Sequence, residues 1–148
     1  MDSVPSTTKN TRLRVADVMT EVLITVTPSD SIGHAHQLMS AHGIRQLPVV
    51  EGRELVGVIT DRDIRSATGN DLPLDSAAIA QALDTAVRDV MADEPATLSP
   101  HDDLQTVLRL FIEEKFGGIP VVDENAGLLG IITYIDLLRC FSNRLLED

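Results

Sequence analysis

The sequence has 148 residues, of which 12 are Lys or Arg and 23 are Asp or Glu, giving a formal net charge of −11 at pH 7. This length favours one compact domain or two small halves that share a core, and an apolar fraction of 43% is enough to form that core. The acidic balance argues against a broad basic face for nucleic acid and against a polybasic membrane contact.

The chain begins with a segment, residues 1–13, that we expect to be a flexible tail. Met1–Asn10 is polar and lacks the apolar stretch of a signal peptide, and no apolar run in the sequence approaches the length of a membrane span. The single cysteine, Cys140, cannot form an intramolecular disulfide and stands in an apolar run, which favours a core residue over a nucleophile. These features predict a cytoplasmic protein that does not contact a membrane.

An internal duplication is the strongest feature of the sequence, and it begins at Val15. Segments of the first half recur in order in the second half, first at an offset of 72 positions and then, after one extra residue, at an offset of 73. The matching pairs are Val15–Met19 with Val87–Met91, Thr25–Pro28 with Thr97–Pro100, Leu47–Val50 with Ile119–Val122, and Leu55–Thr60 with Leu128–Thr133. Asp63 and Asp136 keep the second offset. Because chance does not give so many ordered matches, the chain contains two copies of one unit.

Each copy of the repeat predicts the element order β-α-β-β-α. The first copy has an extended segment Leu23–Val26, a helix capped by Asp30, strands Leu47–Val50 and Leu55–Ile59, and a closing helix capped by Thr60. The second copy has Ala96–Leu98, a helix capped by Asp102, strands Ile119–Val122 and Leu128–Ile132, and a closing helix capped by Thr133. The apolar spacing in the first helix of each copy is that of a helix with one buried face, and Thr and Asp are favoured N-caps. Paired apolar runs separated by turn residues are typical of hairpins.

A linker separates the two copies. Gly69–Asp75 is rich in Gly, Pro and Asp and predicts a loop, and Ser76–Leu83 predicts a short amphipathic helix capped by Asp75. The predicted parts are a tail at 1–13, repeat 1 at 14–69, a linker at 70–85 and repeat 2 at 86–148. One copy of about 55 residues buries too little surface to be stable alone. We therefore expect an α/β (α+β) fold in which the copies pack sheet to sheet into one globule with pseudo-twofold symmetry.

The tandem unit resembles a pair of CBS domains, the module often called a Bateman domain. The resemblance covers residues 14–69 and 86–141 and rests on motifs that occur in both copies. These are the Asp-Val-Met string, Pro48–Val50 with Pro120–Val122, and the closing signatures Gly57–Asp63 and Gly130–Asp136. No single motif is specific, but the same string twice at the repeat spacing is strong. The resemblance implies a stand-alone regulatory module without catalytic activity, which senses a ligand and signals to an effector protein of unknown identity.

CBS pairs bind adenosine-containing ligands in clefts between the copies, so the resemblance implies AMP, ADP or ATP as a ligand, or else NAD or S-adenosylmethionine, with no required cofactor. Thr60 and Thr133 begin helices, where free N–H groups favour a phosphate. Asp63 and Asp136, one turn further on, can accept the hydroxyls of a ribose. The resemblance also implies a purine site and phosphate-facing side chains, formed by Ile24, Ile44, Ala96, Phe116, Arg45 and Arg62.

A purely structural role is the alternative for each polar residue of this set. Thr60 and Thr133 are also suited to be plain N-caps, and Asp63 and Asp136 to be first-turn carboxylates that the helix dipole favours. Arg45 is also suited to a solvated loop. Arg62 is also placed to pair with the neighbouring Asp61.

The copies differ where a phosphate would bind. Gly117 stands in the second copy where the first has Arg45, and Tyr134-Ile135 replaces Asp61-Arg62. Residues 1–74 carry 7 basic and 9 acidic side chains, a net charge of −2, whereas residues 75–148 carry 5 and 14, a net charge of −9. We therefore expect phosphate-rich ligands to favour the cleft of Asp63, and the cleft of Asp136 to take weakly charged adenosine-like ligands or to stay empty.

Other functions find less support in the sequence. The histidines, which are His34, His36, His42 and His101, show no metal-ligand spacing, and no catalytic triad, P-loop or dinucleotide fingerprint is present. We expect a homodimer, formed through the apolar helix residues Leu108, Phe111 and Ile112. Two alternatives remain: a structural homodimer with vestigial clefts, and a nucleotide hydrolase, for which the sequence offers no catalytic residue.

Overall fold

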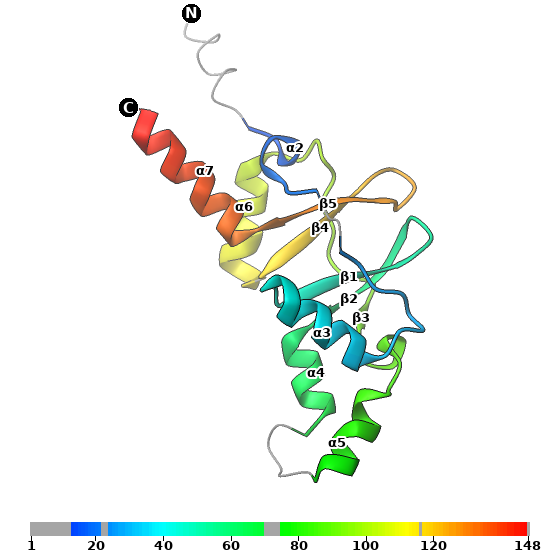
Figure 1. The fold of residues 1–148 in the computed structure, drawn as a ribbon. Helices are drawn as coiled ribbons and strands as arrows, with labels where there is room; N and C mark the ends of the chain where they lie inside the picture. The colour runs from blue at the N-terminus through cyan, green and yellow to red at the C-terminus, as the bar shows by residue number, and fades with distance from the viewer. Residues whose placement is uncertain (1–12, 22–23, 70–74, 116, 148) are drawn as a thin grey trace, which may run out of the picture. The chain divides into compact units, whose positions relative to one another are not determined.

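The computed structural model describes residues 13–21, 24–69, 75–115 and 117–147. They form two compact units (Figure 1): a central unit, made of the described residues from 23 to 95, and an N/C unit, made of those up to 22 and from 96 onward. This division does not follow the order of the sequence repeat. The leading segment of each copy, Val15–Met19 or Val87–Met91, belongs to the unit that holds the strands of the other copy.

The central unit is built on a three-stranded sheet with the strand order β1-β2-β3. Its elements are α3 (Ile32–His42), β1 (Gln46–Glu51), β2 (Glu54–Thr60), α4 (Asp61–Ala67), α5 (Ser76–Leu83), the 3₁₀ turn Val87–Asp89 and β3 (Ala92–Asp93). Its buried core consists of Val26, Ile32, Ala35, Met39, Leu47, Val49, Ile59, Ile64 and Val87. Apart from Val26, these residues come from α3, β1, β2, α4 and the 3₁₀ turn, so α3 and α4 pack their apolar faces against the sheet.

The N/C unit repeats this plan around the antiparallel hairpin β4-β5. Its elements are α2 (Val15–Val18), α6 (Leu104–Glu114), β4 (Gly118–Val122), β5 (Leu128–Thr133) and α7 (Tyr134–Glu147). Its buried core consists of Val15, Leu98, Leu104, Val107, Ile119, Val121, Ile132 and Leu137. A residue of α2 therefore shares one core with residues of the second copy.

The two leading segments are held by equivalent contacts. Val15 and Val87 are both fully buried. The backbone N–H of Val15 donates to the carbonyl oxygen of Asp102 over 2.9 Å, and that of Val87 donates to the carbonyl oxygen of Asp30 over 2.7 Å. Burial of one such valine side chain contributes roughly 1.5–3 kcal/mol. Each leading segment is thus part of the core of its unit.

The N-caps of α3 and α6 are Ser31 and Asp103, so the predicted caps, Asp30 and Asp102, were wrong by one residue. The carboxylate of Asp30 accepts the backbone N–H of the residue three positions before it over 2.8 Å, and that of Asp102 does the same over 2.9 Å. Each predicted cap instead closes the turn that leads into the helix. Consecutive Asp, Ser and Thr residues compete for such local bonds, which is why sequence alone misplaced the cap.

The extended segment predicted at Leu23–Val26 pairs with the sheet at one described position, where Val26 bridges Val49 in parallel. Leu23 itself lies outside the described residues. The next ladder bond toward the N-terminus would need an N–H at Pro48, which proline does not have. The second copy has the same arrangement. Leu98, in the segment Ala96–Leu98 that was predicted as a strand, bridges Val121 in parallel, and Pro120 takes the place of Pro48.

The predicted hairpins, closing helices and linker helix are confirmed. The strands β1 and β2 are antiparallel, with a register that runs from Gln46 opposite Thr60 to Glu51 opposite Glu54. The helix α5 begins after its predicted cap, Asp75, whose Oδ1 accepts a backbone N–H over 2.7 Å. None of the helices in the described part of the chain has the length and apolarity to span a membrane.

Candidate functional site

In the N/C unit, Asp136 lies at the corner where β5 ends and α7 begins. The backbone N–H of Thr133 donates to Asp136 Oδ2 over 2.8 Å, and the backbone N–H of Asp136 donates to Thr133 Oγ1 over 3.2 Å. This reciprocal pair is a capping box, which satisfies two N–H groups at the start of the helix. The predicted N-cap role of Thr133 is therefore real. It also fixes the orientation of the Asp136 carboxylate.

The Asp136 carboxylate is unusual because its residue is only 8% exposed. Its Oδ1 accepts the hydroxyl hydrogen of Thr20 over 2.8 Å, and Arg139 Nη1 lies 3.9 Å from the same oxygen. Its Oδ2 accepts from Thr133 Oγ1 over 3.1 Å as well as from the backbone. A buried carboxylate needs such partners, because an unsatisfied one is costly. We refer to Thr20, Thr133 and Asp136 as the Asp136 corner.

The Asp63 corner, formed by Thr60 and Asp63 in the central unit, has the same local geometry. The backbone N–H of Thr60 donates to Asp63 Oδ2 over 2.9 Å, and the backbone N–H of Asp63 donates to Thr60 Oγ1 over 3.1 Å. Ala92, which pairs with Val58 as Thr20 pairs with Ile131, has no hydroxyl to offer. Among the described residues, Asp63 Oδ1 therefore has no hydrogen-bond partner, and it is free to accept one from a ligand.

The two arginines predicted for the first cleft both lie next to the Asp63 corner. The carbonyl oxygen of Arg45 accepts the backbone N–H of Asp61 over 2.8 Å, which ties the loop before β1 to the start of α4. The side chains of Arg45 and Arg62 are exposed. Asp61 forms its ion pair with Arg65 (3.4 Å) and not with Arg62. The structural alternative for Arg62, an ion pair with its neighbour, is thus not observed.

The predicted purine-contacting residues divide between the two units. Ile24 and Ile44 are half-buried against the core of the central unit, the unit that also contains Asp63. Ala96 is exposed in the N/C unit, which contains Asp136. Phe116 lies outside the described residues. Among the described residues, the central unit therefore contains Ile24, Ile44 and Asp63, and the N/C unit contains Ala96 and Asp136.

Sequence reasoning missed two polar residues near these corners, Thr20 and Gln46. Gln46 lies opposite Thr60 in the hairpin, and its Nε2 is buried without a partner among the described residues. An unsatisfied buried donor costs about 1–3 kcal/mol, so an acceptor on a bound ligand would relieve that cost. A comparison of the two copies could have found both residues, because each polar residue aligns with one that has no polar side chain: Thr20 with Ala92, and Gln46 with Gly118.

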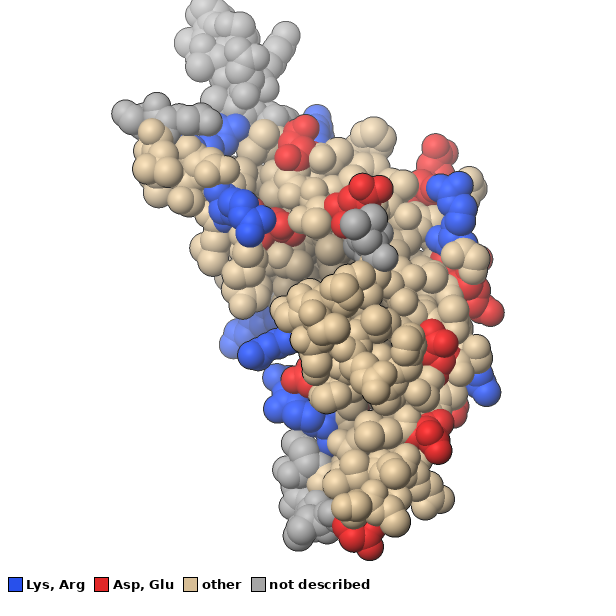
Figure 2. All heavy atoms as spheres, in the orientation of Figure 1, with Lys and Arg blue, Asp and Glu red and all other residues tan. Residues whose placement is uncertain are grey.

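The folded units do not preserve the charge contrast between the sequence halves. Among the described residues, the N/C unit has 5 basic and 10 acidic side chains, and the central unit also has 5 and 10, so the net charge of each is −5. Figure 2 shows acidic side chains scattered over the visible face. The net charge of a unit therefore does not distinguish the two corners, because residues 13–21 and 75–95 each fold with the other half of the chain. The local difference between Arg45 and Gly117 remains.

Within the described residues, no group of three or more His, Cys, Asp or Glu side chains is placed to hold a metal ion. The carboxylates of the two corners are engaged in capping boxes. Their geometry is suited to accepting hydrogen bonds from a ligand with hydroxyl donors, such as a ribose.

Comparison with known proteins identifies the repeat. A family model for the CBS domain matches residues 15–70 and 87–143. The CBS domain-containing protein YhcV of Bacillus subtilis is 35% identical over 125 residues, which cover 83% of this chain and 81% of that protein. Inosine-5'-monophosphate dehydrogenase of Korarchaeum cryptofilum is 36% identical over 115 residues, which cover 78% of this chain but only 21% of the enzyme. The match to such enzymes is confined to their CBS part.

Solved structures of CBS pairs have the same fold. The crystal structure of CBSX2 in complex with AMP matches with a TM-score of 0.76 and 32% identity, covering 88% of this chain and 96% of that one. The CBS domain pair of protein MJ0100, in complex with 5'-methylthioadenosine and S-adenosyl-L-methionine, matches with a TM-score of 0.73 and 27% identity. That match covers 90% of this chain and 98% of the other.

Proposed function

The chain belongs to the CBS-domain family, and we propose on that premise that it is a regulatory module which binds AMP, ADP or ATP through Asp63 and Asp136. Ligand occupancy is then signalled to an effector protein. The carrying observation is that each carboxylate is oriented by a capping box at the end of a hairpin, at the repeat spacing. A carboxylate held in one orientation binds a diol without the cost of ordering its own side chain.

The Asp63 corner is the better prepared of the two for a phosphate-bearing ligand. Asp63 Oδ1 has no hydrogen-bond partner among the described residues, and the exposed Arg45 and Arg62 lie beside it. At the Asp136 corner, the Thr20 hydroxyl already occupies Oδ1, and a ribose hydroxyl must displace or share that bond. Arg139 is the cation nearest to this second carboxylate. We propose that phosphate-rich ligands favour Asp63, and weakly charged adenosine-like ligands Asp136.

Two relatives support an adenosyl ligand and differ in its identity. CBSX2 was crystallised with AMP. The similarity to MJ0100, crystallised with 5'-methylthioadenosine and S-adenosyl-L-methionine, favours a second candidate, a sensor of sulfur-containing adenosyl metabolites. An adenosine moiety is common to both. The absence of a phosphate in the second class separates them experimentally.

A homodimer formed through the last helix is part of the proposal. Helix α7 has an exposed apolar stripe at helical spacing: Tyr134 is 54% exposed, Leu138 58%, Phe141 39% and Leu145 76%. Of the residues that the sequence suggested, Ile112 is exposed at 74%, whereas Leu108 and Phe111 pack against the core of the N/C unit. A stripe of this kind is costly in water and is covered at low cost by the same stripe of a second copy. We propose that the cytoplasmic form of the protein is this dimer.

Calorimetric titration of the protein with AMP, ADP, ATP and S-adenosylmethionine tests the nucleotide proposal. Asp63→Asn and Asp136→Asn keep an oxygen for the capping box but remove the negative charge that accepts the ribose hydroxyls. We expect each change to weaken binding at its own corner about tenfold. Asp61→Asn is the matched control, because Asp61 is in the same turn as Asp63 but pairs with Arg65. If no adenosyl ligand binds, the clefts are vestigial and a purely structural homodimer is the better account. If ligands bind but the variants bind them like the control, the proposed role of the two carboxylates is wrong.

A further inference from the structure

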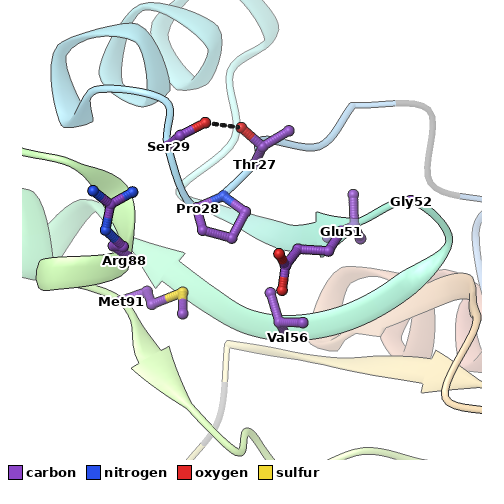
Figure 3. Close-up of a pocket in the computed structure, with 9 residues that line it drawn as sticks. Thr27, Pro28, Ser29, Glu51, Gly52, Val56, Arg88 and Met91 are labelled. Carbon is purple, nitrogen blue, oxygen red and sulfur yellow. Dashed lines mark hydrogen bonds between the residues drawn. The ribbon is translucent and has the colours of Figure 1, made fainter.

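The central unit has a hollow at the turn end of its hairpin, away from the Asp63 corner (Figure 3). Its volume is about 620 Å³, within the range of small-molecule sites. It is lined by Thr27, Pro28, Ser29, Val50, Glu51, Gly52, Val56, Arg88 and Met91. In the β1-β2 register, Glu51 lies opposite Glu54 beside the turn, whereas Thr60 lies at the other end of the hairpin opposite Gln46. The hollow is therefore separate from the proposed nucleotide site.

The apolar floor of this hollow depends on two local features of β2. Val49 pairs with Gly57 and Val50 with Leu55, so Val56 is the extra residue of a β-bulge, and it is half-buried in the hollow. A bulge changes the direction of a side chain relative to the regular strand. Gly57 leaves room for the second floor residue, because a Cβ there would lie 2.6 Å from the sulfur of Met91.

Two opposite charges line the hollow. The backbone of Arg88 is held in place, because its N–H donates to the carbonyl oxygen of Pro28 over 3.0 Å and the preceding Val87 is fully buried. Glu51 is the last residue of β1. Figure 3 shows the Arg88 guanidinium and the Glu51 carboxylate on different sides of Pro28. Both residues are exposed, and within the described parts of the chain neither side chain has a hydrogen bond or an ion pair.

The hollow also has hydroxyl groups. Thr27 Oγ1 and Ser29 Oγ lie 3.3 Å apart and share one hydrogen bond. A hydroxyl has one hydrogen and two acceptor lone pairs, so this pair retains a hydrogen with which to contact an anion. The hydroxyls come from the loop before α3, and Arg88 is tied to the same loop through Pro28.

The N/C unit shows that the fold does not require either charge. Ala16 replaces Arg88 there, and its backbone N–H donates to the carbonyl oxygen of Pro100 over 2.9 Å, which is the equivalent bond. Asp123 replaces Glu51, and its Oδ1 accepts the backbone N–H groups of Asn125 and Gly127, both over 2.8 Å. The acidic side chain of that unit is thus used inside its own turn. In the central unit, both charges are available to a ligand.

We propose that this hollow binds a small aliphatic zwitterion, an α-amino acid. Its carboxylate binds the Arg88 guanidinium, which can form two parallel hydrogen bonds with it, and its ammonium group binds the Glu51 carboxylate. Its aliphatic side chain covers Val56 and Met91. A ligand with one sign of charge leaves one of the two protein charges unmatched. Because Arg88 is on a leading segment and Glu51 on the hairpin, the amino acid connects the two and stabilises the central unit by mass action.

An NMR titration of the ¹⁵N-labelled protein with L-leucine tests this site. We expect the amide signals of Ser29, Gly52 and Val56 to shift in a saturable way at millimolar leucine, and that of Thr60 to stay in place. The two analogues that lack one charge, 4-methylpentanoate and 3-methylbutylamine, should each bind about tenfold more weakly. Absence of a saturable shift, or equal binding of either analogue, overturns the proposal. Equal binding of an analogue would show that the hollow binds a simple ion and does not require a zwitterion.

Variants locate the contacts. We expect Arg88→Ala and Glu51→Gln each to weaken leucine binding about tenfold. The first change introduces the residue type that the N/C unit has at the equivalent position. Arg53→Ala is the matched control, since it removes an exposed cation from the same turn without altering the lining of the hollow. If Arg88→Ala binds leucine as well as the control, the proposed contact is wrong. AMP binding by the Arg88 variant should equal that of the unaltered protein, so failure of this proposal is distinguishable from failure of nucleotide binding.

Discussion

The hydroxyl of Thr20 donates a hydrogen bond to Oδ1 of Asp136 over 2.8 Å and so joins residues that are 116 positions apart. Thr20 is held there because its backbone N–H and carbonyl oxygen exchange hydrogen bonds with Ile131 over 2.8 and 2.9 Å. The equivalent position in the central unit is Ala92, so Asp63 lacks this bond. The two corners have the same capping box and differ in the saturation of one carboxylate oxygen.

Replacement of Thr20 by alanine should destabilise the protein in the absence of ligand. The change removes a hydrogen bond to a buried charge, and we expect the free energy of unfolding to fall by about 1.5–3 kcal/mol. Urea denaturation followed by circular dichroism measures it. The reciprocal change, Ala92→Thr, places a hydroxyl beside the half-buried Asp63 and should not destabilise. An unaltered denaturation midpoint for Thr20→Ala would show that the hydrogen bond contributes nothing.

Exchange of Arg45 and its counterpart Gly117 should alter phosphate recognition. Arg45→Gly should weaken ATP binding about tenfold while leaving adenosine binding nearly unchanged, because only the phosphates contact the guanidinium. Gly117→Arg should strengthen ATP binding at the Asp136 corner, since nothing lies within 4 Å of a Cβ at that position. Calorimetry with both ligands at two salt concentrations provides the measurement. Equal losses for ATP and adenosine would contradict a phosphate role for Arg45.

Substitution of Gly130 should loosen the leading segment of the first copy. A Cβ on Gly130 would lie 2.6 Å from the carbonyl oxygen of Thr20, a backbone atom that cannot move without breaking the bridge to Ile131. We expect Gly130→Ala to cost about 1–3 kcal/mol of stability. Gly117→Ala, where a Cβ meets nothing within 4 Å, is the control. Thermal unfolding compares the two, and similar midpoints would show that the segment shifts at no cost.

Introduction of a charge into the exposed stripe of α7 should prevent dimer formation. We expect Leu138→Glu to give a monomer in light scattering coupled to size-exclusion chromatography, because burying an unpaired carboxylate in an apolar interface is unfavourable. Glu113→Gln, on the exposed surface of α6, is the control and should leave the mass unchanged. A monomeric unaltered protein, or a dimeric Leu138 variant, would show that this stripe is not the interface.

The sequence predicted those parts of the structure that depend on neighbours within a few residues. The Thr60–Asp63 and Thr133–Asp136 capping boxes span three positions, and residue types at that spacing are enough to form them. The hairpins followed from paired apolar runs. The caps of α3 and α6 were misplaced by one residue, because adjacent Asp, Ser and Thr residues can make the same local bonds.

By itself, the sequence determined the duplication, the family, the hairpins and the two corner carboxylates, because each rests on short-range chemistry repeated twice. Only the tertiary structure decided which leading segment completes which unit. It placed the Thr20 hydroxyl against the Asp136 carboxylate, and Arg88 beside the hairpin that contains Glu51. It also equalised the net charges of the described residues in the two units. The physical reason is that contacts between distant segments depend on which surfaces are buried together. The order of residues along the chain does not specify which distant segments meet.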